Sequence, residues 1–195
     1  MNSITNILYW ISTGLLVPVI ALLLFGFVRA LSLLGSFFGM YISRIKNEKQ
    51  QREFIVNLEN NQDPGPQIKG NKLFNNHLQR ILNAKGHILI TEKVLADFDI
   101  ASEKELSSSK SLSKLGPMVG LMGTLIPMGP ALVGLAQGDI ASMAQNMQVA
   151  FSTTVVGLLA GAIGYVTQLV KQRWFVADAN NLEYIANLLN KNSHA

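Results

Sequence analysis

Charged residues are confined to a few stretches of this chain, and this segregation is the feature that most constrains its fold. The stretch from Met1 to Val28 has no charged residue, and residues 115–170 have only Asp139. Most of the 16 basic and 12 acidic residues fall between Arg44 and Lys114. Charged residues make up 14% of the chain, against about 25% in an ordinary soluble domain. Lipid and water as two separate solvents account for this pattern, which predicts an integral membrane protein.

The first apolar run, from Ile4 to Ile42, is longer than one membrane span and too short for two spans with a turn. We predict a span over about residues 9–28, with the helix continuing through Tyr41. Tyr9 and Trp10 would anchor one membrane interface, and Arg29 would reach lipid headgroups at the other. A cleaved signal peptide is the alternative, but this run is long for one and lacks a basic amino-terminal region.

The remaining apolar stretches predict two further spans, over 115–136 and 143–170, joined by a short connection that has one acid and no base. Basic residues gather between the first and second spans and again after the third. Because basic loops remain on the cytoplasmic side, we place the amino terminus outside the inner membrane and the carboxyl terminus in the cytoplasm. The predicted class is all-α with four parts: a first transmembrane helix and its extension (1–43), a cytoplasmic helical domain (44–114), a pore hairpin (115–170) and a cytoplasmic carboxyl-terminal helix (171–195).

The polar region predicts a solvated helical stalk. Apolar residues at helical spacing indicate helices over about 43–60, 72–84 and 88–106. The Pro- and Gly-rich residues 61–71 predict a break, and Gly86 a helix end.

No catalytic constellation or cofactor site is predicted. The chain has no cysteine, and His77, His87 and His194 lack the spacing of metal ligands and are expected on solvated surfaces. No phosphate-binding Gly-Lys loop occurs. The net charge of +4 comes from bases that flank apolar segments and alternate with acids, which favours a topology signal over nucleic-acid binding.

Glycines recur at four-residue spacing in each apolar stretch. The pairs are Gly35 with Gly39, Gly116 with Gly120, and Gly157 with Gly161. This spacing lets helix backbones approach closely in lipid, and we expect the contacts between subunits.

Prolines and hydroxyls interrupt the apolar spans. Pro117 lies near the predicted start of the second span, where a missing N–H costs nothing. Pro127 and Pro130 lie inside it and deprive the carbonyls of Gly123 and Ile126 of their usual donors. The resulting kink would face either a hydrated interior or a neighbouring helix.

Four hydroxyl residues are the strongly polar side chains deep in the second and third spans, namely Thr124, Ser152, Thr153 and Thr154. Each could simply bond its own helix carbonyl, or the cluster in the third span could line water. Neither span contains Asp, Glu, His, Lys or Arg in its interior. Ion translocation normally needs an ionisable group in the membrane, so a partner would have to supply it.

Two linked motifs resemble the MotA/TolQ/ExbB proton-channel family. Gly116-Pro117 and Gly120-Leu121-Met122-Gly123-Thr124 are similar to the family pattern in the second span, and Ala150-Phe151 with Thr154-Val155-Val156-Gly157-Leu158 to that in the third. Three spans with a large loop after the first are similar to the TolQ/ExbB branch. The chain departs from that branch at Val149, where the branch has Glu, at Ile163, where it has Pro, and in having Pro127 and Pro130.

The resemblance implies a homopentamer around a dimer of a single-span ExbD/TolR-like protein whose membrane Asp carries the proton. It also implies that Thr124 and Thr154 face the pore. Steps of three or four from Thr154 reach Ala150, Phe151, Gly157, Leu158 and Gly161, which would form a smooth lining. The implied function is a stator subunit of a motor driven by the proton-motive force. A non-conducting membrane scaffold is the alternative.

Overall fold

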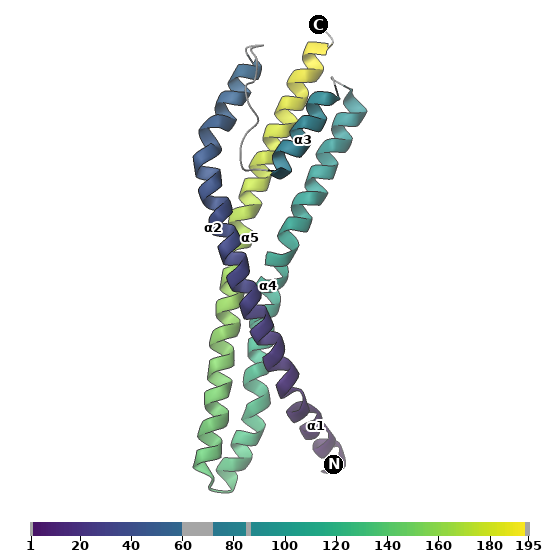
Figure 1. Ribbon diagram of the computed structural model, residues 1–195. Coiled ribbons are helices and arrows are strands. Elements are labelled where there is room, and N and C mark those ends of the chain that lie inside the picture. The colour runs from purple at the N-terminus through teal and green to yellow at the C-terminus, as the bar shows by residue number, and fades with distance from the viewer. Residues whose placement is uncertain (1, 60–71, 85–86, 194–195) are drawn as a thin grey trace. The chain divides into compact units, whose positions relative to one another are not determined.

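The computed structural model of the chain describes residues 2–59, 72–84 and 87–193, and its regular elements are α-helices (Figure 1). They are α1 (Asn2–Gly14), α2 (Leu16–Glu59), α3 (Lys72–Asn83), α4 (Ile88–Ala136) and α5 (Ile140–Ser193). No strand occurs within these described ranges, so the predicted all-α class is confirmed. The break predicted over 61–71, Gly86 and His194 lie outside the described residues.

Three helical segments are long and apolar enough to cross a membrane, as predicted: Tyr9–Lys46, Ile88–Ala136 and Ile140–Asn190. Their most apolar windows have mean hydropathies of 2.5, 1.7 and 1.8. Only 11%, 28% and 33% of these windows are buried inside the protein. Most of this apolar surface is therefore open to lipid or to other protein chains.

The predicted span over 9–28 lies within the first of these segments, and a one-residue turn at Leu15 divides it near its start. α1 ends at Gly14 and α2 begins at Leu16. Pro18 explains the interruption, because it has no N–H to donate to the Gly14 carbonyl and its ring crowds that carbonyl. Helical bonding continues on either side, from Leu15 N to Ile11 O at 3.1 Å and from Val19 N to Leu15 O at 3.1 Å.

The helix predicted over 88–106 and the second span form one continuous helix, α4. The serine-rich segment between them, residues 107–113, does not break it. The hydroxyls of Ser107 and Ser113 donate to the carbonyls of Lys104 and Lys110, at 2.8 and 2.9 Å. Because these serines satisfy their hydroxyls on the helix itself, they can be accommodated without an external partner.

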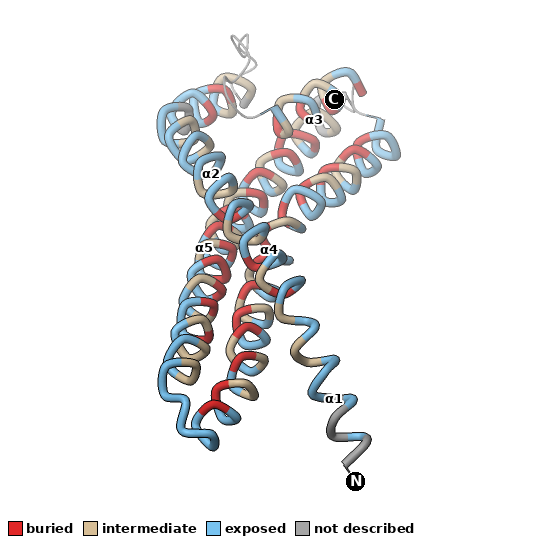
Figure 2. Tube along the Cα trace, turned by 60° about the horizontal axis from the view of Figure 1, so that its bottom comes forward, coloured by how far each residue is buried: buried red, intermediate tan, exposed pale blue. Residues whose placement is uncertain are grey.

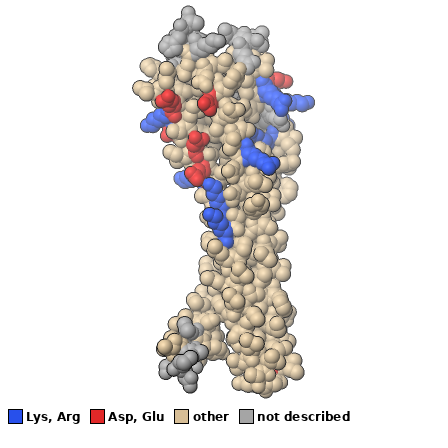
Figure 3. Space-filling model, turned by 180° about the vertical axis from the view of Figure 1, so that it is seen from behind, with Lys and Arg blue, Asp and Glu red and all other residues tan. Residues whose placement is uncertain are grey.

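The contacts divide the chain into two compact units. Unit 1 comprises Met1–Leu34 and Ser108–Thr167, and unit 2 comprises Gly35–Ser107 and Gln168–Ala195. Helices α2, α4 and α5 contribute to both. Unit 1 has only four charged residues in its sequence: Arg29, Lys110, Lys114 and Asp139. On the face drawn in Figure 3, acidic and basic side chains gather over unit 2.

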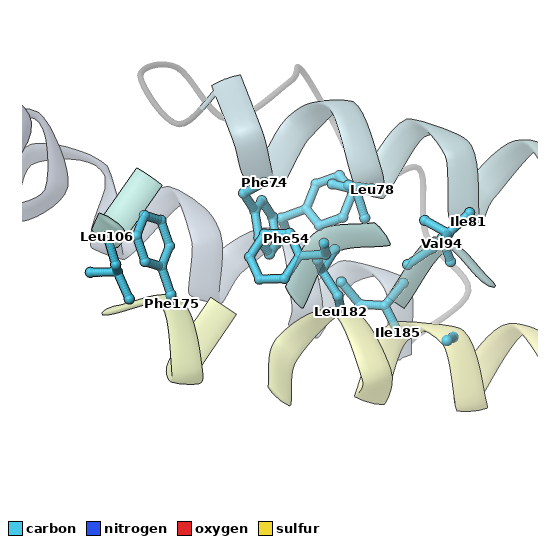
Figure 4. Close-up of a cluster of buried hydrophobic side chains, with 11 residues drawn as sticks. Phe54, Phe74, Leu78, Ile81, Val94, Leu106, Phe175, Leu182 and Ile185 are labelled. Atoms are coloured by element: carbon cyan, nitrogen blue, oxygen red, sulfur yellow. The ribbon is translucent and has the colours of Figure 1, made fainter. Parts of the chain in front are cut away.

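Unit 2 is a bundle with a packed core, which corrects the expectation of a solvated stalk. α3 contributes Phe74, Leu78 and Ile81, which its helical spacing places on one face (Figure 4). Its partners come from the end of α2, the start of α4 and the end of α5. The buried members are Phe54, Phe74, Leu78, Ile81, Val94, Phe98, Leu106, Phe175, Leu182, Ile185 and Ala186.

His77 belongs to the interior of unit 2, whereas a solvated surface was expected. Its side chain is buried, its Nδ1 lies 2.8 Å from the Leu73 carbonyl oxygen, and its ring meets that of Phe98 edge-on at 5.3 Å. It therefore acts as a packed and hydrogen-bonded core residue. His87 is exposed, as predicted.

A buried ion pair in unit 2 has no counterpart among the predictions. Asp178 is fully buried on α5 and accepts a hydrogen bond from Arg44 Nη1 at 2.6 Å, with Gln51 Nε2 at 3.4 Å. Trp174 lies one turn earlier and stacks on Phe37 with ring centroids 5.7 Å apart. The pair joins α2 to α5 and places a carboxylate where an apolar residue would be usual.

Candidate functional site

The two helices that carry the linked motifs pack against each other in unit 1 along a seam of small residues. A Cβ added to Gly116 would lie 2.8 Å from the backbone nitrogen of Gly161 and 2.9 Å from the carbonyl oxygen of Gly157. A Cβ on Gly157 would lie 2.6 Å from the Cα of Gly120. Figure 2 shows buried residues along this stretch of α4 and α5. The backbones are thus so close that only glycine fits at these positions.

These contacts correct the expected role of four glycines. Gly116, Gly120, Gly157 and Gly161 were expected to pack between subunits, but they join α4 to α5 of the same chain. For Gly35 and Gly39 on α2, an added Cβ would meet no described atom within 4 Å outside its own stretch of helix. The four-residue spacing predicts close approach in both cases, but it cannot tell which helix approaches.

The seam continues through Gly123 and Pro127 toward the end of α4. A Cβ on Gly123 would lie 2.6 Å from the Cβ and the hydroxyl of Thr153. Pro127 is less than 2% exposed, whereas Pro130 is partly exposed. For Pro127 the structure therefore favours the alternative of a proline buried in helix packing. α4 stays helical through both prolines.

Thr124 and Thr154 face each other across this helix pair. The hydroxyl of Thr154 lies 3.4 Å from that of Thr124, 3.5 Å from the Gly120 carbonyl oxygen and 3.3 Å from that of Ala150. Thr124 donates to the Leu121 carbonyl at 2.8 Å. Both side chains are half-buried. The two motifs thus meet through hydroxyls in an otherwise apolar pair of helices.

The other two hydroxyls of the third span point elsewhere. Ser152 is exposed and donates to the Gln148 carbonyl at 2.8 Å. Thr153 is buried against Gly123 and donates to the Ala150 carbonyl at 2.9 Å. Successive helix residues point about 100° apart, so the three hydroxyls do not form one polar surface. This corrects the idea of a common water-lined face.

The smooth face expected around Thr154 is also divided. Ala150, Gly157 and Gly161 are buried, the two glycines against α4, whereas Phe151 and Leu158 are 63% and 54% exposed. A surface available to another chain therefore begins at Thr154 and continues over the bulkier side chains. Burial of the small residues follows from the glycine contacts, which turn that side of α5 toward α4.

The ends of unit 1 are fixed by polar contacts. In the connection between α4 and α5, Asp139 Oδ1 accepts the N–H of Ser142 at 3.0 Å and caps α5, while Gly138 adopts φ 75°.

Arg29 on α2 donates to the Ser108 hydroxyl on α4 at 3.0 Å. Arg29 was expected to extend to lipid headgroups, and this bond gives it a protein partner as well. Tyr9 and Trp10 are exposed and meet edge-on with centroids 6.4 Å apart.

A second charged contact lies where α4 and α5 enter unit 2. Lys171 is 2% exposed, and its Nζ lies 3.5 Å from Glu105 Oε1. From the sequence, Lys171 is one of the basic residues that follow the third span. Its burial has no local sequence signal, because it depends on the packing of α4 against α5.

The comparisons with known proteins agree with the helices that form this site. No curated protein sequence matches the chain. The family model described as the MotA/TolQ/ExbB proton channel family matches residues 70–181, which include α3, α4 and most of α5. The match covers more than half of the 195 residues and both linked motifs. The chain therefore belongs to the MotA/TolQ/ExbB proton channel family.

Proposed function

We propose that this chain is the channel subunit of a membrane motor driven by the proton-motive force, similar to the TolQ/ExbB branch of its family. In this proposal five copies surround a dimer of a single-span ExbD/TolR-like partner in the inner membrane. Protons cross at the boundary between the two proteins and drive their relative rotation. One charge crossing 100 mV releases about 2.3 kcal/mol, so a few protons per step suffice for mechanical work.

The observation that carries the proposal is the contact between Thr124 and Thr154 at 3.4 Å, which joins the two family motifs. A threonine hydroxyl can donate and accept a hydrogen bond, but it does not ionise near neutral pH. Such a pair can hold water or a carboxylic acid beside it without trapping a proton. Both residues are half-exposed in the single chain, so a partner helix could reach them.

The carboxylate that carries the proton must then come from the partner. Residues 115–136 and 140–170 contain no Asp, Glu, His, Lys or Arg. An aspartate on the partner's span, placed beside Thr154, would complete the pathway. Its protonation would alternate as it faces one side of the membrane and then the other.

The proposed orientation follows from the basic residues. The amino terminus and the connection around Asp139 lie outside, while most of unit 2 and the carboxyl terminus lie in the cytoplasm. The connection around Asp139 has no basic residue, which suits the outer side of the membrane. The basic residues near Arg44 suit the cytoplasmic side.

Proton uptake into liposomes under an imposed membrane potential tests the proposal. The chain alone should conduct almost nothing, and the chain purified with the protein encoded beside it should conduct. Replacement of that partner's membrane Asp by Asn should abolish the flux. Robust flux without a partner would contradict the proposal. Absence of flux with an assembled partner would favour the non-conducting scaffold.

A further inference from the structure

Unit 2 has a groove between α4 and α5 that is lined by apolar and acidic residues. Its volume is about 400 Å³. Phe175, Val176 and Ala179 are among its apolar lining residues, and Val176 is 65% exposed. The exposed residues Asp99, Glu103 and Glu183 stand along it. A partner for this groove should offer apolar side chains followed by basic ones.

α2 of the same unit has an exposed face of that chemistry. Phe38, Ile42 and Ile45 follow one another at helical spacing, and Val56 lies about three turns farther on the same side. Their side chains are 54%, 65%, 60% and 49% exposed. This face is opposite the buried side of α2, where Gln51 and Phe54 enter the bundle. Among the residues whose side chains are described, Lys46, Lys49, Arg52 and Glu53 are the charged ones on or beside this face.

We infer that the acidic groove of α4 and α5 receives the apolar and basic face of α2 from a second copy of this chain. The inference rests on the homo-oligomer of the proposed function and identifies its contact surface in unit 2. The two faces differ and lie on different helices of the bundle. Their contact is therefore head-to-tail, the type of interface that generates a closed ring when the rotation closes.

The positions of the charges along the bundle support this pairing. Copies held at one depth in a membrane can join only residues at equal heights. Arg44 contacts Asp178 at 2.6 Å, so α2 and α5 are level at these two residues. Lys49 and Glu183 are each five residues farther along helices that run in the same direction, about 7.5 Å at 1.5 Å per residue. They are therefore level with each other.

A second pair follows in the same way from the antiparallel helix α4. Glu105 contacts Lys171 at 3.5 Å, so α4 and α5 are level at these two residues. Asp99 is six residues before Glu105 on the antiparallel helix, which places it near the height of residue 177 of α5. Arg44 is level with Asp178, and α2 and α5 run in the same direction, so Lys46 lies near the height of residue 180. The difference, about 4.5 Å, is within the reach of a lysine side chain. Ile42 and Ile45 then lie at the height of Val176 and Ala179, two lining residues of the groove.

Disulfide trapping tests the inference directly, because the chain has no cysteine of its own. Two forms of different length and tag would be produced together in membranes, one with Lys49→Cys and the other with Glu183→Cys. Oxidation should give a band that contains both forms, at least several-fold stronger than with the control Tyr184→Cys. Tyr184 is exposed at nearly the same height but points about 100° away around α5.

A charge exchange provides a second readout. Lys49→Glu should weaken the oligomer in native mass spectrometry, and Lys49→Glu with Glu183→Lys should restore it. An oligomer without preferential trapping of the Lys49 and Glu183 positions overturns this inference and leaves the proposed oligomer standing. Trapping of position 183 on a different protein also overturns it. A monomer in membranes and in mild detergent contradicts both the inference and the proposed oligomer.

Discussion

The hydroxyl of Thr154 lies 3.4 Å from the hydroxyl of Thr124, although 30 residues separate them in the chain. The contact exists because Gly116, Gly120 and Gly157 let the backbones of α4 and α5 approach closely just beside it. A bulkier residue in that seam would separate the two hydroxyls. Helix packing and the proposed ion pathway therefore depend on the same few residues.

Thr154→Val should reduce proton flux through the chain with its partner by about tenfold or more. The replacement keeps the shape of the side chain and removes the hydroxyl, a loss comparable to the ~1.4 kcal/mol that corresponds to a tenfold rate change. Thr154→Ser keeps the hydroxyl and should retain most of the flux. Liposome uptake would measure both variants, and assembly would be checked by co-purification. Equal flux in the Val and Ser variants would rule out a role for this hydroxyl.

Gly157→Ala should destabilise the packing of α4 on α5 by about 1–3 kcal/mol. Its Cβ would lie 2.6 Å from the Cα of Gly120 and 2.8 Å from the carbonyl oxygen of Gly116, and backbone atoms cannot turn aside as a side chain can. Gly26→Ala is the control in α2 of the same unit, because its Cβ would meet Leu112 Cδ1 at 4.0 Å, an ordinary van der Waals contact. The control should be neutral or stabilising by up to about 1 kcal/mol, as alanine favours a helix. Unfolding in mixed micelles would measure both, and equal effects would contradict the proposed seam.

Asp178→Asn should destabilise unit 2 by about 3 kcal/mol, because it leaves the Arg44 guanidinium poorly compensated beside a buried amide. Arg80 and Asp97 provide the control pair. They are as close, 2.7 Å, but their side chains are 47% and 35% exposed. Asp97→Asn should therefore cost much less stability than Asp178→Asn. Thermal unfolding followed by circular dichroism would compare the two variants. A larger loss of stability in Asp97→Asn than in Asp178→Asn would contradict the prediction that burial makes the Arg44–Asp178 pair the more important one.

Single cysteines at Gln137 and Ser107 should react with an impermeant thiol reagent from opposite sides of the membrane. Both positions are exposed, Gln137 in the connection between α4 and α5 and Ser107 in unit 2. Gln137→Cys should label in intact spheroplasts. Ser107→Cys should label only after the membrane is opened. Reaction of both in intact spheroplasts would overturn the proposed orientation.

The sequence alone determined the membrane class, the number of apolar helices and the family. These follow from properties that are local in the chain: the length of an apolar run, the absence of charge within it, and motifs of a few residues. The preference of an apolar run for lipid over water is roughly the sum over its residues, so it can be predicted without knowing which segments pack against the run. The linked glycine and threonine motifs are similarly local, and the family match over residues 70–181 covers them.

Only the tertiary structure decided which surface each residue meets. The glycine spacing predicted close approach, but the partner of Gly116 proved to be Gly161 of the same chain. The sequence assigned no contact to Asp178 or Lys171, and both are buried by contacts from distant segments. His77 likewise became a core residue because Phe98 and the Leu73 carbonyl surround its ring. Burial and pairing depend on residues far apart in sequence, and no local pattern specifies where the chain brings them together.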